Sequence, residues 1–171
     1  ALALTVLAVV ANAALARTKL VALPARGETI IRLDNEQATL IEEERVLTLQ
    51  KGVNKVDFSW TGVSIDPDSI RLVPLTHPGK VVLLNVSFPP GEAALVWEIS
   101  APEAWEEKVR ISYLLGGIDR LVTYRAVADK PEKNLALRSF IVLRNFSGED
   151  FNHAQVLPDA AQEFEQSILH E

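Results

Sequence analysis

Short apolar runs alternate with turn-forming residues over most of the chain. Residues 53–58 and 105–115 alternate apolar and polar side chains, as expected for antiparallel strands with one buried face. Clusters of Gly, Pro, Asn and Asp separate the runs. The pattern predicts about nine or ten strands at a spacing of roughly ten residues, which is typical of a mainly β protein. We expect an antiparallel β-sandwich, immunoglobulin-like or similar. The predicted strands cover residues 29–33, 38–49, 53–58, 70–75, 80–88, 93–99, 105–115, 121–128, 135–143 and 153–157.

Three local features refine this prediction. Pro74 cannot donate to a strand ladder, so the strand at 70–75 is expected at a sheet edge. The acidic triple Glu42-Glu43-Glu44 indicates an exposed, potentially bulged middle of the strand at 38–49. The stretch 144–151 predicts a tight connection after the strand at 135–143, because it combines Asn, Ser and Gly.

The two ends of the chain differ from this β pattern. Residues 1–16 carry no charge, and they predict an apolar helix that is either a retained membrane anchor or an uncleaved signal segment. Sixteen residues span about 24 Å as a helix, short of the hydrocarbon core of about 30 Å, so an anchor would need a few more residues or help from neighbours. We favour a single-pass anchor because the segment is present in the chain. Its lipid-facing residues would be Leu2, Leu4, Val6, Leu7, Val9, Val10 and Leu15.

The expected organisation follows from these boundaries. Residues 1–17 form the anchor or signal segment, 18–27 a linker, and 28–158 the β-sandwich. The stripe of apolar residues in 159–171 predicts a short C-terminal helix. An A-x-A pattern within the apolar segment favours a sandwich on the periplasmic, extracytoplasmic side of the cell membrane.

Composition and charge exclude several classes of function. The net charge of −6 argues against nucleic-acid binding, which requires a basic surface. The chain has no cysteine, so disulfides, thiolate metal sites and a cysteine nucleophile are excluded. The hydrophobic content of 48% is sufficient for a packed core.

The sequence contains no recognisable catalytic or metal-binding constellation. His77, His153 and His170 are far apart in sequence, whereas zinc sites usually include a closely spaced pair. Asp66 and Asp68 lack the further oxygen ligands of a calcium loop. Glu149-Asp150 beside His153 could form an acid–base pair, but we favour a solvated hairpin turn as the explanation of these residues. We therefore expect no metal, no cofactor and no enzymatic activity.

Tryptophans offer the main candidates for partner contacts. Trp97 lies within an apolar strand and is expected in the core. Trp60 and Trp105 lie near strand ends, where an aromatic side chain serves either the core or an interface. Both alternatives stay open for these two residues.

Several patches resemble a bacterial family of exported domains of unknown function, found in mucoidy-inhibitor-A-like proteins. The patches span about residues 30–157, and Arg120 stands near a position where the family usually has tryptophan. The resemblance implies an exported β-rich domain and supplies no catalytic residues. The patches are residues 38–45 with Lys51-Gly52-Val53, residues 62–70, and residues 111–114 with Gly117, Tyr124 and residues 145–151.

Together these features predict a non-catalytic, membrane-anchored accessory or scaffold subunit of a larger membrane complex, such as a respiratory or photosynthetic one. Its partners would be integral membrane subunits and, through residues 1–16, membrane lipid. The alternative is a soluble, secreted or periplasmic binding module with a cleavable signal peptide.

Overall fold

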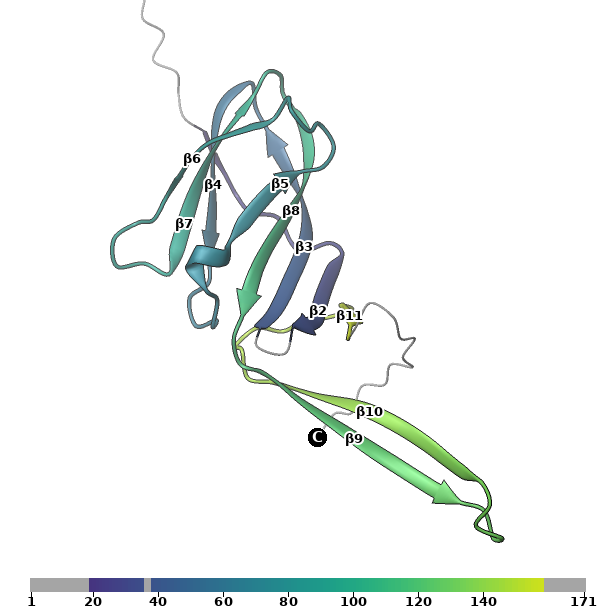
Figure 1. Ribbon diagram of the computed structural model, residues 1–171. Helices are drawn as coiled ribbons and strands as arrows, with labels where there is room; N and C mark the ends of the chain where they lie inside the picture. The colour runs from purple at the N-terminus through teal and green to yellow at the C-terminus, as the bar shows by residue number, and fades with distance from the viewer. Residues whose placement is uncertain (1–18, 36–37, 159–171) are drawn as a thin grey trace, which may run out of the picture.

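A computed structural model describes residues 19–35 and 38–158, and these residues form a mainly β protein with three sheets (Figure 1). The only helical element within them is the short 3-10 helix η1 (Pro67–Ser69). The strands are β1 (Lys19–Val21), β2 (Thr29–Asn35), β3 (Ala38–Leu49), β4 (Gly52–Ser59), β5 (Arg71–Pro74), β6 (Val82–Ser87), β7 (Ala94–Ala101), β8 (Trp105–Leu115), β9 (Ile118–Ala128), β10 (Leu135–Asn145) and β11 (Gln155–Leu157).

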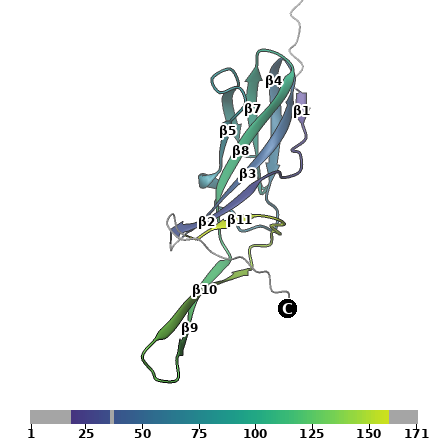
Figure 2. The ribbon, with the colours of Figure 1, turned by 90° about the vertical axis from the view of Figure 1, so that its right-hand side faces the viewer.

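Two of the sheets pack face to face and form the body of the molecule, consistent with the predicted β-sandwich (Figures 1 and 2). The first sheet has the strand order β1-β4-β7-β6, and the second has the order β11-β2-β3-β8-β5. Neighbouring strands are antiparallel, except that β1 pairs with β4 and β11 pairs with β2 in parallel. The first strand, β1, therefore lies at one edge of the first sheet, and the last strand, β11, lies at one edge of the second sheet.

Alternating apolar residues of both sheets form the core between them. Phe58 of the first sheet contacts Trp97 beside it and Tyr113 of the second sheet, with ring centroids 5.6 and 5.9 Å apart. Burying each large apolar side chain stabilises the fold by about 1.5–3 kcal/mol. The fully buried aliphatic residues of the core include Ile41, Leu47, Leu49, Val56, Ile99, Val109 and Ile111.

The long alternating strands match the sequence prediction well. The boundaries of β3 and β8 agree with the predicted strands at 38–49 and 105–115. The strand containing Pro74 lies at the edge of the second sheet, as predicted. Trp97 is 1% exposed in the core, also as predicted.

Two predictions require correction. The expected linker at 18–27 contains β1, whose residues pair with Asn54 to Val56 of β4. The expected exposed middle of β3 is wrong, because Glu43 is fully buried and the pairing of β3 with β8 runs without a register shift. Two arginines contact the Glu43 carboxylate, so its burial does not leave an isolated charge.

The expected N-terminal and C-terminal helices at 1–17 and 159–171 lie outside the described residues. Among the residues that are described, the structure contains no helix long and apolar enough to cross a membrane.

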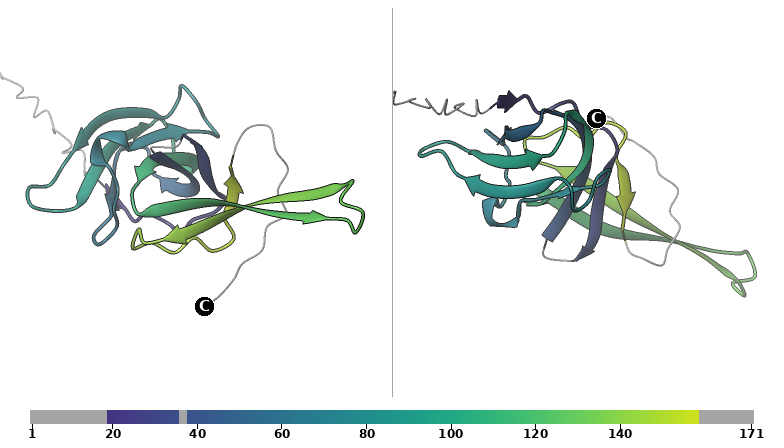
Figure 3. Two further views of the ribbon diagram at one scale, coloured as in Figure 1. Left: turned by 60° about the horizontal axis from the view of Figure 1, so that its bottom comes forward. Right: turned by 90° about the horizontal axis from the view of Figure 1, so that it is seen from above.

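The third sheet is a two-stranded ribbon made of β9 and β10. It leaves the body near the end of β8 and extends well away from both larger sheets (Figures 1 and 3). Both strands are predicted by the pattern of apolar residues, but they are expected within the sandwich. Their separation from the body is the feature that the candidate site depends on.

Candidate functional site: the projecting ribbon and its attachment

The ribbon, defined here as residues 118–145, is held together by an unbroken antiparallel register. Its pairs run from Ile118 opposite Asn145 to Ala128 opposite Leu135. No other strand of the described chain pairs with β9 or β10, so each has one open edge. Isolated two-stranded hairpins are marginally stable in water. A ribbon of this length therefore has more to gain from a partner than a strand inside a sheet.

One face of the ribbon is almost entirely apolar beyond its base. We call it the apolar face. Tyr124 is 69% exposed and Leu137 is 62% exposed on this face. Contiguous exposed apolar surface of this kind marks interaction sites in soluble domains. The register places the following residues on the apolar face: Val122, Tyr124, Ala126, Ala128, Leu135, Leu137, Ser139 and Ile141.

The opposite face carries a pair of like charges. Arg125 lies directly opposite Arg138 in the register, between apolar residues such as Phe140 and Val127. Like charges at directly opposed positions destabilise a strand pair. The described residues provide no acidic partner for either side chain. This arrangement costs stability within the ribbon and favours an anionic partner.

Charge is also segregated between the ribbon and the rest of the chain. Residues 118–145 contain six Lys or Arg and three Asp or Glu, a net charge of +3. The remaining residues contain eleven Lys or Arg and twenty Asp or Glu, a net charge of −9. The chain as a whole is acidic, but the ribbon is basic and the remaining residues are acidic.

A compact turn closes the tip of the ribbon. The carboxylate of Asp129 accepts hydrogen bonds from the side-chain amide of Asn134 at 2.6 Å and from the backbone N–H of Lys133 at 2.9 Å. These hydrogen bonds, that from Asn134 first, lower the pKa of Asp129 below its ordinary value. The strands are thus held together at the end furthest from the body.

The base of the ribbon is tied to the body by Arg120. Its guanidinium donates to the carbonyl oxygens of Leu33 at 2.6 Å and of Asn35, at the end of β2. On the opposite face, Arg144 pairs with Asp119 at 2.5 Å. Arg120 anchors the first residues of the ribbon even though most of its length is free of the body.

Backbone hydrogen bonds also attach the ribbon, through the turn that follows it, to the loop after β4. The N–H of Ser64 donates to the carbonyl of Ser147 at 3.0 Å, and the N–H of Phe146 donates to the carbonyl of Gly117 at 2.7 Å. Gly148 has φ +84° and its backbone passes so close to Gly62 that a Cβ would lie 2.2 Å from the Gly62 carbonyl oxygen. The predicted tight connection at 144–151 therefore packs directly on the loop that follows β4.

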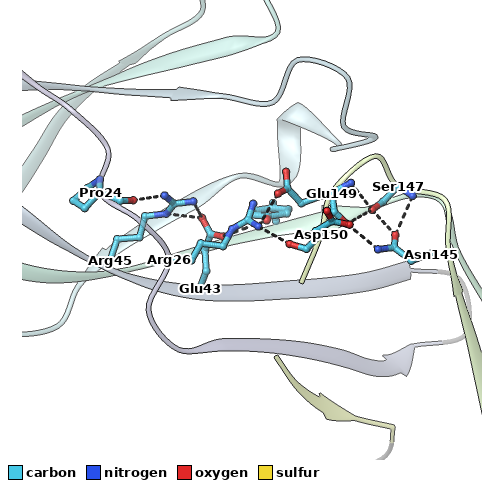
Figure 4. Close-up of polar contacts among 9 residues, drawn as sticks. Pro24, Arg26, Glu43, Arg45, Asn145, Ser147, Glu149 and Asp150 are labelled. Carbon is cyan, nitrogen blue, oxygen red and sulfur yellow. Dashed lines mark hydrogen bonds and ion pairs between the residues drawn. The ribbon is translucent and has the colours of Figure 1, made fainter. Parts of the chain in front are cut away.

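A buried ion cluster joins this connection to the centre of β3 (Figure 4). Glu43 is fully buried and contacts Arg26 at 2.5 Å and Arg45 at 2.8 Å. Arg26 also contacts Glu149 at 2.8 Å. Burial alone would lower the pKa of Arg26, but the hydrogen bond to Glu149 and the charge of Glu43 outweigh burial and raise it. Through Arg26 the cluster ties the turn after the ribbon to the centre of the second sheet.

A second buried carboxylate lies at the far end of β8. Glu107 is fully buried and accepts hydrogen bonds from the backbone N–H groups of Thr76 and His77, at 2.9 and 3.0 Å. Its other oxygen lies 2.7 Å from Nδ1 of His77, whose ring stacks on Trp105 with centroids 4.0 Å apart. These contacts fix the loop after β5.

The structure places the two candidate partner-contact tryptophans in the body. Trp60 is 8% exposed and belongs to the core cluster, which fits the core alternative. Trp105 is half-buried against His77, and its buried Nε1 has no hydrogen-bond partner among the described residues. The candidate anchor residues between Leu2 and Leu15 lie outside the described residues.

The candidate chemical groups are not brought together. Glu149 is engaged by Arg26, while His153 is exposed. Asp66 accepts a hydrogen bond from the N–H of Asp68 and caps η1. Within the described ranges no three His, Asp or Glu side chains are grouped in a way that could hold a metal ion. His170 lies outside the described residues.

Two open depressions are found on the described chain. The smaller has a volume of about 260 Å³ and lies at the base of the ribbon, lined by residues 38–39 and 115–120. The larger of the two lies on the body. It has a volume of about 590 Å³ and is lined by Leu20, Val21, Ala22, Pro24, Thr48 and Gln50. It has no charged lining side chain that could orient a substrate. The ribbon is therefore the better candidate for a functional surface.

The fold and this site define a mainly antiparallel β protein with two packed sheets and a projecting β-ribbon. Comparison with protein-family models, with curated proteins and with solved structures gives no match.

Proposed function

We propose that this protein is a non-catalytic accessory or scaffold subunit that binds its partner through the β9–β10 ribbon. The observation that carries the proposal is the exposure of large apolar side chains on a ribbon with two open strand edges. Strand addition supplies affinity through main-chain hydrogen bonds, and the alternating side chains supply specificity. The ribbon provides both kinds of contact.

The proposal includes the membrane as the place of assembly. The uncharged residues 1–16 support a retained anchor, and the resemblance to exported domains supports an extracytoplasmic, immunoglobulin-like sandwich. Integral membrane subunits are then the expected neighbours. If residues 1–16 are removed as a signal peptide, the same ribbon serves a soluble periplasmic binding module.

The attachment of the ribbon supports a binding role for a rigid arm. Arg120, Ser147 and Gly148 fix the base in several directions, so the ribbon presents its faces at a defined angle to the body. A pre-positioned arm loses less conformational freedom on binding than a flexible loop does.

The test is extraction of the full chain from its native membrane with mild detergent, followed by native gel analysis. We expect the wild-type chain to migrate in a larger particle with integral membrane proteins. The double variant Tyr124→Glu, Leu137→Glu places charge on the apolar face and should leave that particle. A matched variant of the body, Val73→Glu, changes a valine that is 52% exposed and should remain in it.

Two results would contradict the proposal. Retention of the ribbon variant in the larger particle would remove the ribbon from partner binding. Release of the wild-type chain from membranes by salt alone would exclude the membrane-anchored form and leave the soluble binding module.

A further inference from the structure

The body carries a second unpaired strand edge that complements the ribbon. Strand β6 lies at the edge of the first sheet, and all six of its residues are exposed. Leu84 in its centre is 54% exposed, and Phe88 just beyond its end is 53% exposed. Exposed edge strands are usually protected by charged residues, proline, a β-bulge or short length. Residues 82–87 contain no charged residue and no proline, and the register shift between Leu83 and Asn85 leaves the side chain of Leu84 exposed.

The ribbon has the length and edges needed to pair with such a strand. Each of its strands has eleven residues, which corresponds to about 37 Å at about 3.4 Å per residue, whereas β6 has six residues. The ribbon strands contain no proline that would interrupt a ladder. One open ribbon edge therefore covers the full length of β6.

The chain cannot satisfy its own β6 edge with its own ribbon. In Figure 1 strand β6 lies at the upper left of the body, whereas the ribbon leaves the lower end of the body and projects to the lower right. The contacts of Arg120 and Ser147 hold the base in this orientation. A ribbon can meet this edge only on a second molecule.

Charge favours contact between ribbon and body over contact between two ribbons. Two ribbons packed on each other would bring together two net charges of +3, including two Arg125–Arg138 pairs. A ribbon on the body of a second copy instead brings a charge of +3 to described residues that contain ten Lys or Arg and fifteen Asp or Glu, a net charge of −5. Complementary charge speeds association and selects the correct partner.

We propose that the ribbon of one copy adds as a strand to the β6 edge of a second copy. This inference rests on the proposed function of the ribbon as a docking arm and identifies the partner as the same protein. The first sheet of the acceptor is extended beyond β6, and the apolar side chains near Leu84 are covered. Reciprocal exchange of arms gives a closed dimer with two equivalent contacts.

The experiment measures the molar mass of the full chain in mild detergent by light scattering. We expect a wild-type dimer. Leu84→Lys adds a charge to the acceptor edge, and Tyr124→Glu, Leu137→Glu adds charges to the ribbon, so each variant alone should be monomeric. Val73→Lys, at an exposed position of β5, serves as the matched control and should remain dimeric. Unchanged circular dichroism establishes that each variant is folded.

Mixing the two monomeric variants provides the decisive measurement. The Leu84→Lys chain keeps an intact ribbon, and the ribbon variant keeps an intact β6. Equal amounts should therefore form a mixed dimer with one contact, which dissociates at a higher concentration than the wild-type dimer does. Restored dimerisation requires that the two altered surfaces face each other across one interface.

Three outcomes would overturn the inference. A wild-type monomer at every concentration tested would exclude self-association, even if the ribbon still governs assembly with other subunits as proposed above. A dimer formed by the Leu84→Lys variant alone would show that the ribbon binds elsewhere, for example on another ribbon. A mixture that stays monomeric would show that the ribbon and β6 are not partners.

Discussion

Nη1 of Arg26 lies 2.8 Å from Oε1 of Glu149, a residue 123 positions later in the chain. The same guanidinium contacts Glu43, which is fully buried at the centre of β3. One side chain thus connects the segment before β2, the middle of the second sheet and the turn that follows the ribbon.

Removing the buried carboxylate should destabilise the fold strongly. Glu43→Ala leaves Arg26 and Arg45 without their shared anion, and breaking a buried ion pair costs about 3–5 kcal/mol. The adjacent Glu42 pairs with Arg32, whose side chain is 39% exposed, so Glu42→Ala should cost only about 0–1 kcal/mol. Urea denaturation followed by tryptophan fluorescence measures both. If the two variants lost the same free energy of unfolding, the structural role of Glu43 would be contradicted.

Substitution of Gly148 should weaken the attachment of the ribbon. Gly148→Ala introduces a Cβ 2.2 Å from the Gly62 carbonyl oxygen, in addition to the cost of about 1–2 kcal/mol for a positive φ. Gly91 has φ +76° with open space around it, so Gly91→Ala has the second cost only. The free energy of unfolding should therefore fall further for Gly148→Ala. The Ser64 amide donates a hydrogen bond to the Ser147 carbonyl. Faster hydrogen exchange at this amide in Gly148→Ala would therefore show that the attachment of the ribbon is weakened.

Stability should decrease at alkaline pH through Tyr113. Burial, together with the charge of Glu43, raises the pKa of Tyr113 above its ordinary value of about 10. The folded protein keeps this proton at pH values where the unfolded chain loses it. The contribution is complete below about pH 10 and is lost as the pH rises through the higher pKa of the folded state. We expect Tyr113→Phe to show a smaller loss of unfolding free energy between about pH 9 and 11. Parallel pH profiles would contradict this assignment.

The tip of the ribbon should loosen at acidic pH. The pKa of Asp129 is lowered from 3.8 by its hydrogen bonds, so its carboxylate stabilises the turn above that value. This stabilisation is lost as the pH falls through the lowered pKa. Amide NMR shifts of Lys133 and Asn134 should follow the titration, while core signals such as that of Trp97 stay constant. In the Asp129→Asn variant the transition should be absent.

The sequence predicts the body well where one face of a strand is buried and the other is solvated. Strands β3 and β8 satisfy this condition, and their alternating side chains therefore locate their boundaries. Residues 135–143 are apolar on both faces, a pattern that resembles a strand buried between two layers. In the structure most of these residues are exposed. The periodicity of a strand shows which of its faces are apolar. It does not show whether other residues of the same chain pack on those faces.

The buried carboxylates show a second limit of sequence reasoning. Glu43 and Glu107 lie in charged strands and are indistinguishable from solvated residues by pattern alone. Their burial depends on partners far away in sequence: Arg26 for Glu43, and His77 for Glu107. The turn at 144–151 was predictable because Asn145, Ser147 and Gly148 act locally, whereas its packing on the loop after β4 was not.

The ribbon has a consequence for the folding of the body. Residues far apart in sequence must meet when Ser147 joins Ser64 and Glu149 joins Arg26, and closing long loops has an entropic cost. A hairpin forms within about 1–10 μs from local contacts, and this one brings Gly117 and Phe146 together at its base. Once the ribbon has formed, the effective loop between β8 and the closing turn is short. If the ribbon forms before the rest of the fold, the loops that the Ser147 and Glu149 contacts must close are shortened by the length of residues 118–145.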